Sequence, residues 1–502
     1  MLMDPMEPLA SPPPETPRYT AAREIVANLR DHGHLAYFAG GCVRDHLLGT
    51  PAKDFDVATS ATPEAVLQIF SARGLRTLSV GAHFGVVLVC LGADEAGREI
   101  QTEVATFRHD GAYADGRRPN AVQYTTDPRE DVLRRDFTIN GMLLDPLASS
   151  GDPLAPSDPL APPGTPALLD FVGGQSDLTR RIIRAIGNPL TRFTEDKLRM
   201  LRAVRFAARL HFTLDPSTAA AITHLAPEIL QVSAERIREE LTKILTEGGA
   251  RRCFELLLDL GLLPHLLPEA VRTIGVEQPP DWHPEGDVWT HTMLLLEKLP
   301  PACSPTLAWG ALLHDIGKPP TYHHDSSDPT HPRIRFNGHV EVGVRIAETI
   351  LRRLRFSNED TDQILALIKN HMRFGDFPSM RESTVKRFLR LPRFQEHLDL
   401  HWLDCTSCHG RLGIWEAATA RFHAEPTPET RPHLLLTGRD LIAAGYPPGP
   451  RFKEILTAAE DAQLEGAVLT PADALAYVHA RFGPPEPHKA LRTAPSLGAA
   501  SR

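Results

Sequence analysis

The sequence predicts an α+β protein in which a mixed α/β domain at the N-terminus is followed by an all-helical remainder. Three observations predict this fold. Short apolar runs alternate with helical stretches from Thr20 to about Val172, helical periodicity dominates from Ile182 onward, and proline and glycine interrupt the chain near residues 278–284. With 502 residues, the chain has enough material for three or more folding units with buried cores.

The predicted segments follow from local composition. Residues 1–18 are rich in proline and acid, and we expect them to form a disordered leader. The α/β head is expected over residues 19–175, with a proline-rich insertion over 145–170 in which Asp-Pro-Leu-Ala recurs. Within the head, residues 84–91 (FGVVLVCL) predict a buried strand and residues 100–107 (IQTEVATF) its neighbour. The remaining segments are a helical neck (176–280), a histidine-bearing helical domain (286–410), a helical tail domain (411–482) and a disordered tail (483–502).

Composition and charge restrict the class of protein. A hydrophobic content of 42% and a charged content of 23% are typical of a soluble globular protein. The net charge of −9 excludes a uniformly basic nucleic-acid binder, but the stretch from Asp177 to Arg209 holds nine Lys or Arg against three acids. Six cysteines in so long a chain do not form a disulfide framework, and no signal or membrane-spanning pattern is present. We therefore expect a cytoplasmic protein with no membrane partner, and the sequence implies no obligate protein partner.

A glycine turn and two acidic residues are the most informative part of the head. Gly40 and Gly41 precede Arg44, and Asp54 and Asp56 follow a few residues later. Two Asp separated by one residue project from the same face of a strand. Such a pair can hold two Mg²⁺ ions for nucleotidyl transfer, while the glycines let backbone N–H groups approach a triphosphate that Arg44 neutralises.

Four further residues are placed where a nucleotide-binding pocket needs them. Glu103 falls in the middle of the second predicted strand and is a candidate third acid for the metal pair. Arg135 can bind a phosphate with two hydrogen bonds, and Asp136 and Asn140 offer the acceptor and the amide that bind a ribose hydroxyl.

A helix predicted to begin at Glu195 carries a candidate base-reading pair. Asp196 and Arg199 are three residues apart and are expected to share one helix face. A carboxylate beside a guanidinium matches the pairing edge of cytosine and of adenine, which both show an NH₂ donor next to a ring-nitrogen acceptor. Uracil and guanine present a carbonyl instead, and an unpaired buried polar group costs about 1–3 kcal/mol. The alternative is an ordinary ion pair between neighbouring helical turns.

The head motifs together resemble the class II tRNA nucleotidyltransferase and bacterial poly(A) polymerase superfamily. The resemblance rests on GGCVRDHLLG, KDFDVAT, EVATFR, DGRRP, RRDFTIN and EDKLRMLRAVRFAARL, which occur in this order over about residues 36–210. It implies a polymerase-β-like nucleotidyltransferase head followed by an all-α neck, body and tail. It also implies addition of C, C and A to the 3′ end of tRNA from CTP and ATP, with Mg²⁺ as cofactor.

The resemblance assigns roles to particular residues. The equivalents of Asp54 and Asp56 bind the metals, those of Arg135, Asp136 and Asn140 hold the ribose, and those of Asp196 and Arg199 select the base. The same motif adds Arg202 and Arg205 to the nucleotide-binding candidates. Residues 108–124 resemble the flexible loop that such enzymes use to switch from C to A, which argues against an enzyme restricted to adding CC. The residues around Asp-Phe-Asp are closer to the corresponding motif of poly(A) polymerases, so a poly(A) polymerase or an A-only enzyme is the main alternative.

A second candidate site lies in the histidine-bearing domain. Four potential ligands occur in order along predicted helices: His291, His314, Asp315 and Asp404. Imidazole and carboxylate together suit a divalent transition metal, and His339 and His371 are spaced to complete or enlarge the site. The pattern resembles the HD phosphohydrolase superfamily, which implies a metal-dependent phosphohydrolase activity on phosphoesters. The alternative is an HD unit that only supports the RNA-binding arm.

Two more distant hypotheses remain at this point. One is an HD phosphohydrolase whose N-terminal domain only binds RNA, and the other is a non-catalytic RNA-binding protein. The run Cys405-Thr406-Ser407-Cys408-His409 matches a c-type haem attachment motif, but the absence of an export signal makes a coincidence the better explanation.

Overall fold

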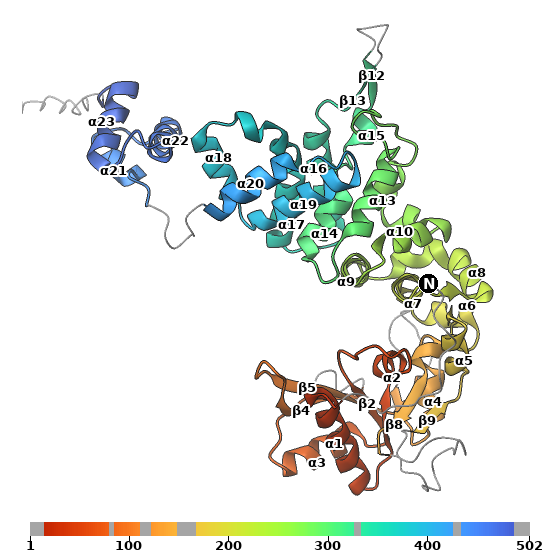
Figure 1. Cartoon of the computed structure of the whole chain (residues 1–502). Helices are drawn as coiled ribbons and strands as arrows, with labels where there is room; N and C mark the ends of the chain where they lie inside the picture. The colour runs from red at the N-terminus through yellow and green to blue at the C-terminus, as the bar shows by residue number, and fades with distance from the viewer. Residues whose placement is uncertain are drawn as a thin grey trace, which may run out of the picture. The chain divides into compact units, whose positions relative to one another are not determined.

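The computed structural model describes residues 15–79, 85–110, 122–147, 167–325, 333–424 and 433–485 (Figure 1). The chain separates into two compact units, Met1–Thr361 and Asp362–Arg502, and the boundary falls inside the predicted histidine-bearing domain. Most of the expected leader, most of the proline-rich insertion, the centre of the 108–124 loop and most of the C-terminal tail lie outside the described residues. None of the described helices combines the length and apolar character needed to cross a membrane.

A seven-stranded sheet forms the centre of the head, in the order β3-β4-β5-β2-β1-β8-β9. Strand β2 pairs with β5 in parallel, and the other neighbours pair antiparallel. The strands are β1 (Ala36–Ala39), β2 (Asp56–Thr59), β3 (Thr77–Leu78), β4 (Val86–Ala93), β5 (Glu99–Thr106), β8 (Met142–Asp145) and β9 (Ala167–Asp170). A separate hairpin joins β6 (Arg108–Asp110) to β7 (Val122–Tyr124). The two strands predicted from apolar runs are confirmed as β4 and β5, which are neighbours in the sheet.

Short helices cover the head sheet. Helix α1 (Pro17–Asp31) buries Ile25, Val26 and Leu29 against the strands, and its first turn is capped by the Thr16 side chain, which accepts a hydrogen bond from the Tyr19 N–H. The helix therefore begins at Pro17, two residues inside the predicted leader, because threonine at the cap and proline in the first turn favour a helix start. The other elements of the head are α2 (Gly41–Leu47), α3 (Pro63–Ala72), α4 (Pro128–Leu133), the 3₁₀ turn η2 (Thr138–Asn140) and α5 (Gly174–Thr179).

The neck is helical as predicted, but the helix expected to begin at Glu195 begins at Leu198. Asp196 has an extended backbone (φ −148°, ψ 104°), and its carboxylate accepts the Leu198 N–H at 3.1 Å. Glu195 is instead the last residue of the preceding helix. The neck elements are β10 (Ile182–Ile183), α6 (Pro189–Glu195), α7 (Leu198–Arg209), β11 (Thr213–Leu214), α8 (Pro216–Leu225), η3 (Ala226–Gln231), α9 (Ala234–Thr246), α10 (Ala250–Asp259), α11 (Leu263–Leu266) and α12 (Pro268–Val271).

The remaining chain is almost entirely helical. The first unit continues through α13 (Val288–Lys298), α14 (Pro305–Leu313), α15 (Lys318–Thr321), the hairpin of β12 (His323–Asp325) and β13 (Arg333–Arg335), and α16 (His339–Arg353). Helix α17 (Asn358–Asn370) contains the boundary between the units. The second unit holds η4 (His371–Ser379), α18 (Glu382–Leu389), α19 (Phe394–Ser407), α20 (Gly413–Ala424), α21 (Gly438–Ala443), α22 (Arg451–Leu464) and α23 (Pro471–Phe482).

Two candidate active sites

The acidic residues of the head meet where strand β2 begins, beside the middle of strand β5. Asp56 is the first residue of β2, and the parallel register pairs Val57 with Val104, which sets Glu103 beside Asp56. Asp54 lies before the strand, is 69% exposed at its side chain and forms an ion pair with Arg18. The prediction that both Asp lie within one strand is therefore wrong in its details. The backbone enters β2 only at Asp56, after the buried Phe55 side chain anchors the preceding turn.

The carboxyl group of Asp56 is destabilised in its charged form. Its pKa is raised to about 6, first because the surrounding protein removes water from it, and then because Glu103 and Asp54 add negative charge against the opposing charge of Arg135. The side chain nevertheless reaches solvent at the strand end. A divalent cation would relieve the repulsion that the charges of Glu103 and Asp54 exert on the Asp56 carboxylate.

The glycine turn brings backbone close to these acids. Gly40 follows β1, whose last residue pairs with Asp56. Its φ of 75° and ψ of −126° lie in a region that suits glycine, and a Cβ there would lie 3.3 Å from the guanidinium of Arg135. Arg135 is held by Asp131, whose carboxylate accepts from its Nη2 at 2.9 Å. Gly41 begins helix α2, so the sequence placed both glycines correctly beside the acids.

A buried hydrogen-bond chain links the head to the neck. Arg44 donates from Nη1 to Asn140 Oδ1 at 2.8 Å, Asn140 donates to Asp136 Oδ1 at 3.2 Å, and Arg202 donates from Nε to Asp136 Oδ2 at 2.8 Å. Burial alone would raise the pKa of Asp136, but the charge and hydrogen bonds of Arg202 and the hydrogen bond of Asn140 lower it overall. The structure thus brings these four predicted residues together. Arg44 also binds the Asp45 carboxylate at 2.6 Å and is 4% exposed, which commits its guanidinium to the protein.

Phe206 is the centre of the same network. The guanidinium carbons of Arg44, Arg202 and Arg205 lie 5.3, 5.5 and 4.6 Å from the centroid of its ring, and Phe137 meets it edge-on at 5.8 Å. Sequence reasoning treated Phe206 only as part of the apolar face of a helix. The motif Arg-x-x-Arg-Phe on helix α7 could have indicated its contact with arginines.

Asp196 and Arg199 do not pair with each other in the structure. Asp196 forms two hydrogen bonds with Arg236 of α9, the shorter at 2.7 Å, while Arg199 binds Glu195 at 2.7 Å and the Arg134 carbonyl at 3.2 Å. The expected shared helix face is therefore wrong, because Asp196 stands outside the helix that carries Arg199. Arg199 reaches the head through the Arg134 carbonyl, whereas the Asp196 side chain is turned to α9.

Arg205 has two carboxylate partners, Glu240 on helix α9 and Glu247 directly after its last residue. Its Nε donates to Glu240 at 2.6 Å and its Nη1 to Glu247 at 2.8 Å, and Arg205 and Glu240 are 6% and 2% exposed. These contacts place the Arg205 guanidinium between α7 and α9. Much of the basic stretch ending at Arg209 is similarly neutralised by ion pairs, which involve Arg184, Arg192, Lys197, Arg199, Arg202, Arg205 and Arg209.

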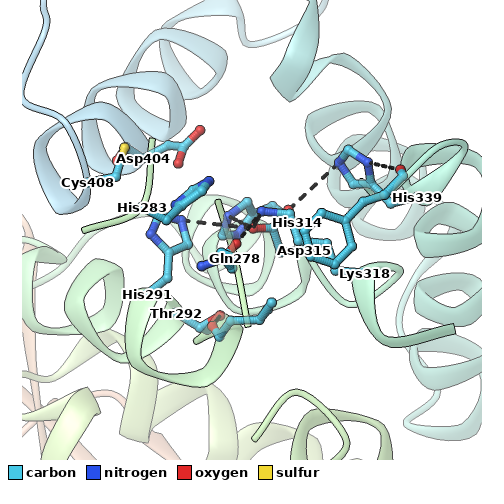
Figure 2. Close-up of polar contacts among 12 residues, drawn as sticks. Gln278, His283, His291, Thr292, His314, Asp315, Lys318, His339, Asp404 and Cys408 are labelled. Atoms are coloured by element: carbon cyan, nitrogen blue, oxygen red, sulfur yellow. Dashed lines mark hydrogen bonds and ion pairs between the residues drawn. The ribbon is translucent and has the colours of Figure 1, made fainter. Parts of the chain in front are cut away.

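The second candidate site gathers around Asp315 in the first unit (Figure 2). The Nε2 atoms of His314, His339 and His291 lie 3.2, 3.8 and 3.9 Å from the Asp315 carboxylate, and both Asp315 and His291 are buried. His291, His314 and Asp315 each offer a ligand atom within 4.8 Å of the other two. Gly317 permits the packing, because a Cβ at this position would overlap the carbonyl oxygen of His339.

Partners outside the predicted ligand set support this cluster. Lys318 donates to Asp315 Oδ2 at 2.7 Å and to Gln278 Oε1 at 2.6 Å. Glu285 Oε1 accepts from His291 Nδ1 at 2.6 Å and from His283 Nδ1 at 2.9 Å. Sequence reasoning missed these residues, although the His-Pro-Glu-Gly-Asp run shortly before His291 was an available signal.

Two predicted ligands belong to the second unit. His371 begins η4 and its Nδ1 lies 2.7 Å from the Ile368 carbonyl, while Asp404 lies on α19. Their participation in the metal site stays a prediction. Cys405 and Cys408 are free cysteines near the end of α19, and burial, followed by the charges of Asp404 and Cys408, raises the pKa of Cys405 to about 12.

Comparison with known families identifies three regions. Residues 36–184 match the poly A polymerase head domain, residues 211–273 match the probable RNA and SrmB-binding site of polymerase A, and residues 287–394 match the HD domain. The fold and the two sites thus define a nucleotidyltransferase of the poly(A) polymerase type that carries an HD domain.

Two relatives and one solved structure show which enzymes of this class the chain resembles. The CCA-adding enzyme of Geobacillus stearothermophilus is 30% identical over 453 residues, covering 90% of this chain and 94% of that protein. The CCA-adding enzyme of Geobacillus sp. (strain WCH70) is 31% identical over 456 residues with the same coverage. The crystal structure of the Bacillus stearothermophilus CCA-adding enzyme in complex with CTP has a TM-score of 0.66 at 28% identity and covers 93% of this chain and 98% of that one. The chain belongs to the family of CCA-adding enzymes, which are tRNA nucleotidyltransferases.

Membership of this family confirms the resemblance found in the sequence. Nucleotidyl transfer in the family is metal-dependent, with Mg²⁺ typical. The relatives do not favour the alternatives of a poly(A) polymerase, an A-only enzyme, a phosphohydrolase with an accessory RNA-binding domain or a non-catalytic RNA-binding protein.

Proposed function

We propose that the head of this protein adds C, C and A to the 3′ end of tRNA from CTP and ATP, at the strand end that carries Asp54, Asp56 and Glu103. The terminal 3′-hydroxyl oxygen attacks the α-phosphorus of the bound nucleotide, and the bond to pyrophosphate breaks. The observation that carries this proposal is the convergence of Asp56 with Glu103 and Asp54. Burial first, and then the charges of Glu103 and Asp54, raise the pKa of Asp56 to about 6.

The donor set fits Mg²⁺. Carboxylate oxygens are the ligands that Mg²⁺ prefers, and Asp54 and Asp56, which both reach solvent, would hold the ion. When bound, the metal neutralises the triphosphate and stabilises the charge that develops during transfer. The adjoining glycine turn leaves room for the triphosphate to approach the backbone at Gly40 and Gly41.

The residues of the buried network hold the nucleotide sugar and align the neck. Arg135 stands beside Gly40 with its guanidinium oriented by Asp131, which suits a phosphate contact. Asp136 and Asn140 are already hydrogen-bonded to each other, so a ribose hydroxyl would join a preorganised pair. Arg44 and Arg202 act on the nucleotide through this pair, because both guanidinium groups are committed to it.

Asp196 and Arg199 are proposed to select the base, each from its own position at the start of α7. Arg236 and Glu195 orient the two side chains. A base that presents an NH₂ donor and a ring-nitrogen acceptor would satisfy the carboxylate and the guanidinium together, while uracil and guanine would leave one of them unpaired.

The HD cluster supports a second proposed function, the hydrolysis of a phosphoester at a divalent transition metal. The supporting observation is the buried group of three imidazoles around the Asp315 carboxylate, a nitrogen-rich donor set that suits such a metal better than Mg²⁺. His291, His314, Asp315 and His339 would hold the metal, and Asp404 and His371 are proposed as further ligands. When bound, the metal lowers the pKa of a coordinated water for attack on phosphorus.

One experiment tests both functions. Purified protein is incubated with tRNA that lacks its 3′ CCA and with labelled CTP and ATP, and separately with a nucleoside 2′,3′-cyclic phosphate and a series of divalent metals. Incorporation of C, C and A in order supports the proposal for the head. Incorporation of A alone, or transfer to arbitrary RNA, contradicts it. Phosphoester hydrolysis that Asp315→Ala abolishes supports the second proposal, and hydrolysis unaffected by that substitution contradicts it.

A further inference from the structure

The segment that precedes helix α13 carries a buried carboxylate whose purpose the two proposed reactions do not explain. The side chain of Glu285 is 7% exposed, and its Oε1 accepts from the Nδ1 atoms of two histidines, His291 and His283. His291 is fully buried, and its second ring nitrogen, Nε2, faces the Asp315 carboxylate at 3.9 Å. One ring nitrogen of His291 is therefore turned to Glu285 and the other to the metal-binding cluster.

This arrangement settles the tautomer that His291 needs as a ligand. A carboxylate can only accept hydrogen bonds, so the nitrogen beside Glu285 carries the proton and the lone pair resides on Nε2. A histidine ligand commonly donates its other N–H to a carboxylate, which fixes the ring and increases the basicity of the ligating nitrogen. Figure 2 shows His283 beside His291, and their ring centroids are 4.9 Å apart in an edge-to-face contact.

The backbone that carries Glu285 is tied to the opposite side of the same cluster. Gln278 donates to the Gly286 carbonyl at 3.4 Å and accepts from Lys318 at 2.6 Å, and Lys318 in turn binds Asp315 at 2.7 Å. Asp287 anchors the segment further by accepting from the Thr290 N–H at 2.8 Å. Glu285 is consequently held in place from both sides, by the histidines at its side chain and by the Gln278–Lys318 link at its backbone.

We propose that Glu285 is a positioning residue for the HD metal site, holding His291 and His283 as Nδ1–H tautomers so that Nε2 of His291 is directed at the metal. This inference rests on the proposed metal site. In this proposal Glu285 acts through His291 and is not itself a ligand of that metal, and its Oε1 is shared by two imidazole N–H groups at hydrogen-bonding distance.

The test measures metal binding to the full-length protein after treatment with EDTA. Co²⁺ is titrated into the wild type, Glu285→Gln, Glu285→Ala and Asp315→Ala, with visible absorption and calorimetry as readouts and metal content as the measure of stoichiometry. Glu297→Gln is the matched control, because Glu297 lies on α13 but is 57% exposed and pairs with Arg251 at the surface. Incorporation of CTP and ATP into tRNA reports on the integrity of the rest of the chain.

We expect both Glu285 variants to weaken Co²⁺ binding about 10–100-fold, to alter the absorption spectrum of the bound ion and to leave nucleotide incorporation within twofold of the wild type. Glu297→Gln should match the wild type in all three measurements. Affinity and spectrum unchanged in Glu285→Ala would overturn the inference. So would two ions bound by Asp56→Ala, which lacks a central ligand of the head site, with loss of only one in Asp56→Ala/Glu285→Ala, since Glu285 would then be a ligand of a second metal in the HD domain. If the wild type binds Co²⁺ no better than Asp315→Ala, the metal site itself is wrong.

Discussion

Arg205, in the neck, has two possible roles: it stabilises the fold, or it binds the nucleotide. The motif that resembles the nucleotidyltransferases makes it a candidate contact for the nucleotide, whereas the structure gives it two carboxylate partners, one on α9 and one directly after that helix. We predict that Arg205→Met destabilises the fold and leaves nucleotide affinity nearly unchanged.

The magnitude follows from burial. Glu240 is 2% exposed and loses the 2.6 Å contact, which leaves an uncompensated charge in the interior, while Glu247 keeps Arg209 at 3.2 Å. Breaking a buried ion pair from one side costs about 3–5 kcal/mol. With an m value of about 3 kcal/mol/M, the urea midpoint should fall by about 1 M or more. In Arg205→Met/Glu240→Leu the charge is removed together with its partner, so most of the stability should return.

The assay is urea denaturation followed by far-UV circular dichroism, together with KM for CTP and ATP measured well below the transition. A double variant no more stable than Arg205→Met would show that the two residues are not energetically coupled. An unchanged urea midpoint combined with a tenfold or larger rise in KM for both nucleotides would refute the reasoning, because Arg205 would then act on the nucleotide.

Two other predictions concern selectivity and pH. Arg199→Ala should relax the choice among the four nucleotides about 10–150-fold, the equivalent of one charged hydrogen bond of about 1.5–3 kcal/mol, and a selectivity retained in single-nucleotide incorporation assays would contradict base reading by this side chain. In the second unit, burial and then the charge of Arg373 lower the pKa of His397 to about 4. In the unfolded chain the pKa of His397 is about 6.5, so the unfolded chain binds a proton at a higher pH than the folded protein does. The free energy of unfolding is therefore highest above pH 6.5 and falls by about 3 kcal/mol in total as the pH drops toward 4. His397→Gln should flatten this pH dependence of the urea midpoint, and an equally steep profile in the variant would contradict the assignment to His397.

Much of the head could be predicted from local sequence. Alternating and apolar runs located strands β4 and β5, and the order of short motifs indicated the family before any fold was known. The residue at which β2 begins was not predicted. Period-two spacing places Asp54 and Asp56 on one face only if both residues are in the strand, and the strand begins at Asp56. The turn before the buried Phe55 side chain ends that regularity.

The errors in the neck have one local and one long-range cause. The helix predicted from Glu195 begins at Leu198, because Asp196 caps the Leu198 N–H, a local signal that apolar periodicity does not contain. The partner of Asp196 is Arg236, forty positions away, and that contact is set by the packing of α9 against α7. A single sequence gives the candidates for a site, but the contacts among them depend on tertiary structure.

The central claim is that Asp56 lies at the centre of a nucleotidyl-transfer site that is separate from the HD cluster. The most direct measurement is incorporation of labelled CTP and ATP into tRNA lacking CCA by the wild type, Asp56→Ala and Asp315→Ala, with Co²⁺ binding measured on the same preparations. We predict that Asp56→Ala abolishes incorporation and retains the absorption spectrum of Co²⁺ at the HD cluster, and that Asp315→Ala retains incorporation and loses that spectrum. Ordered addition of C, C and A by Asp56→Ala at the wild-type rate would contradict the account.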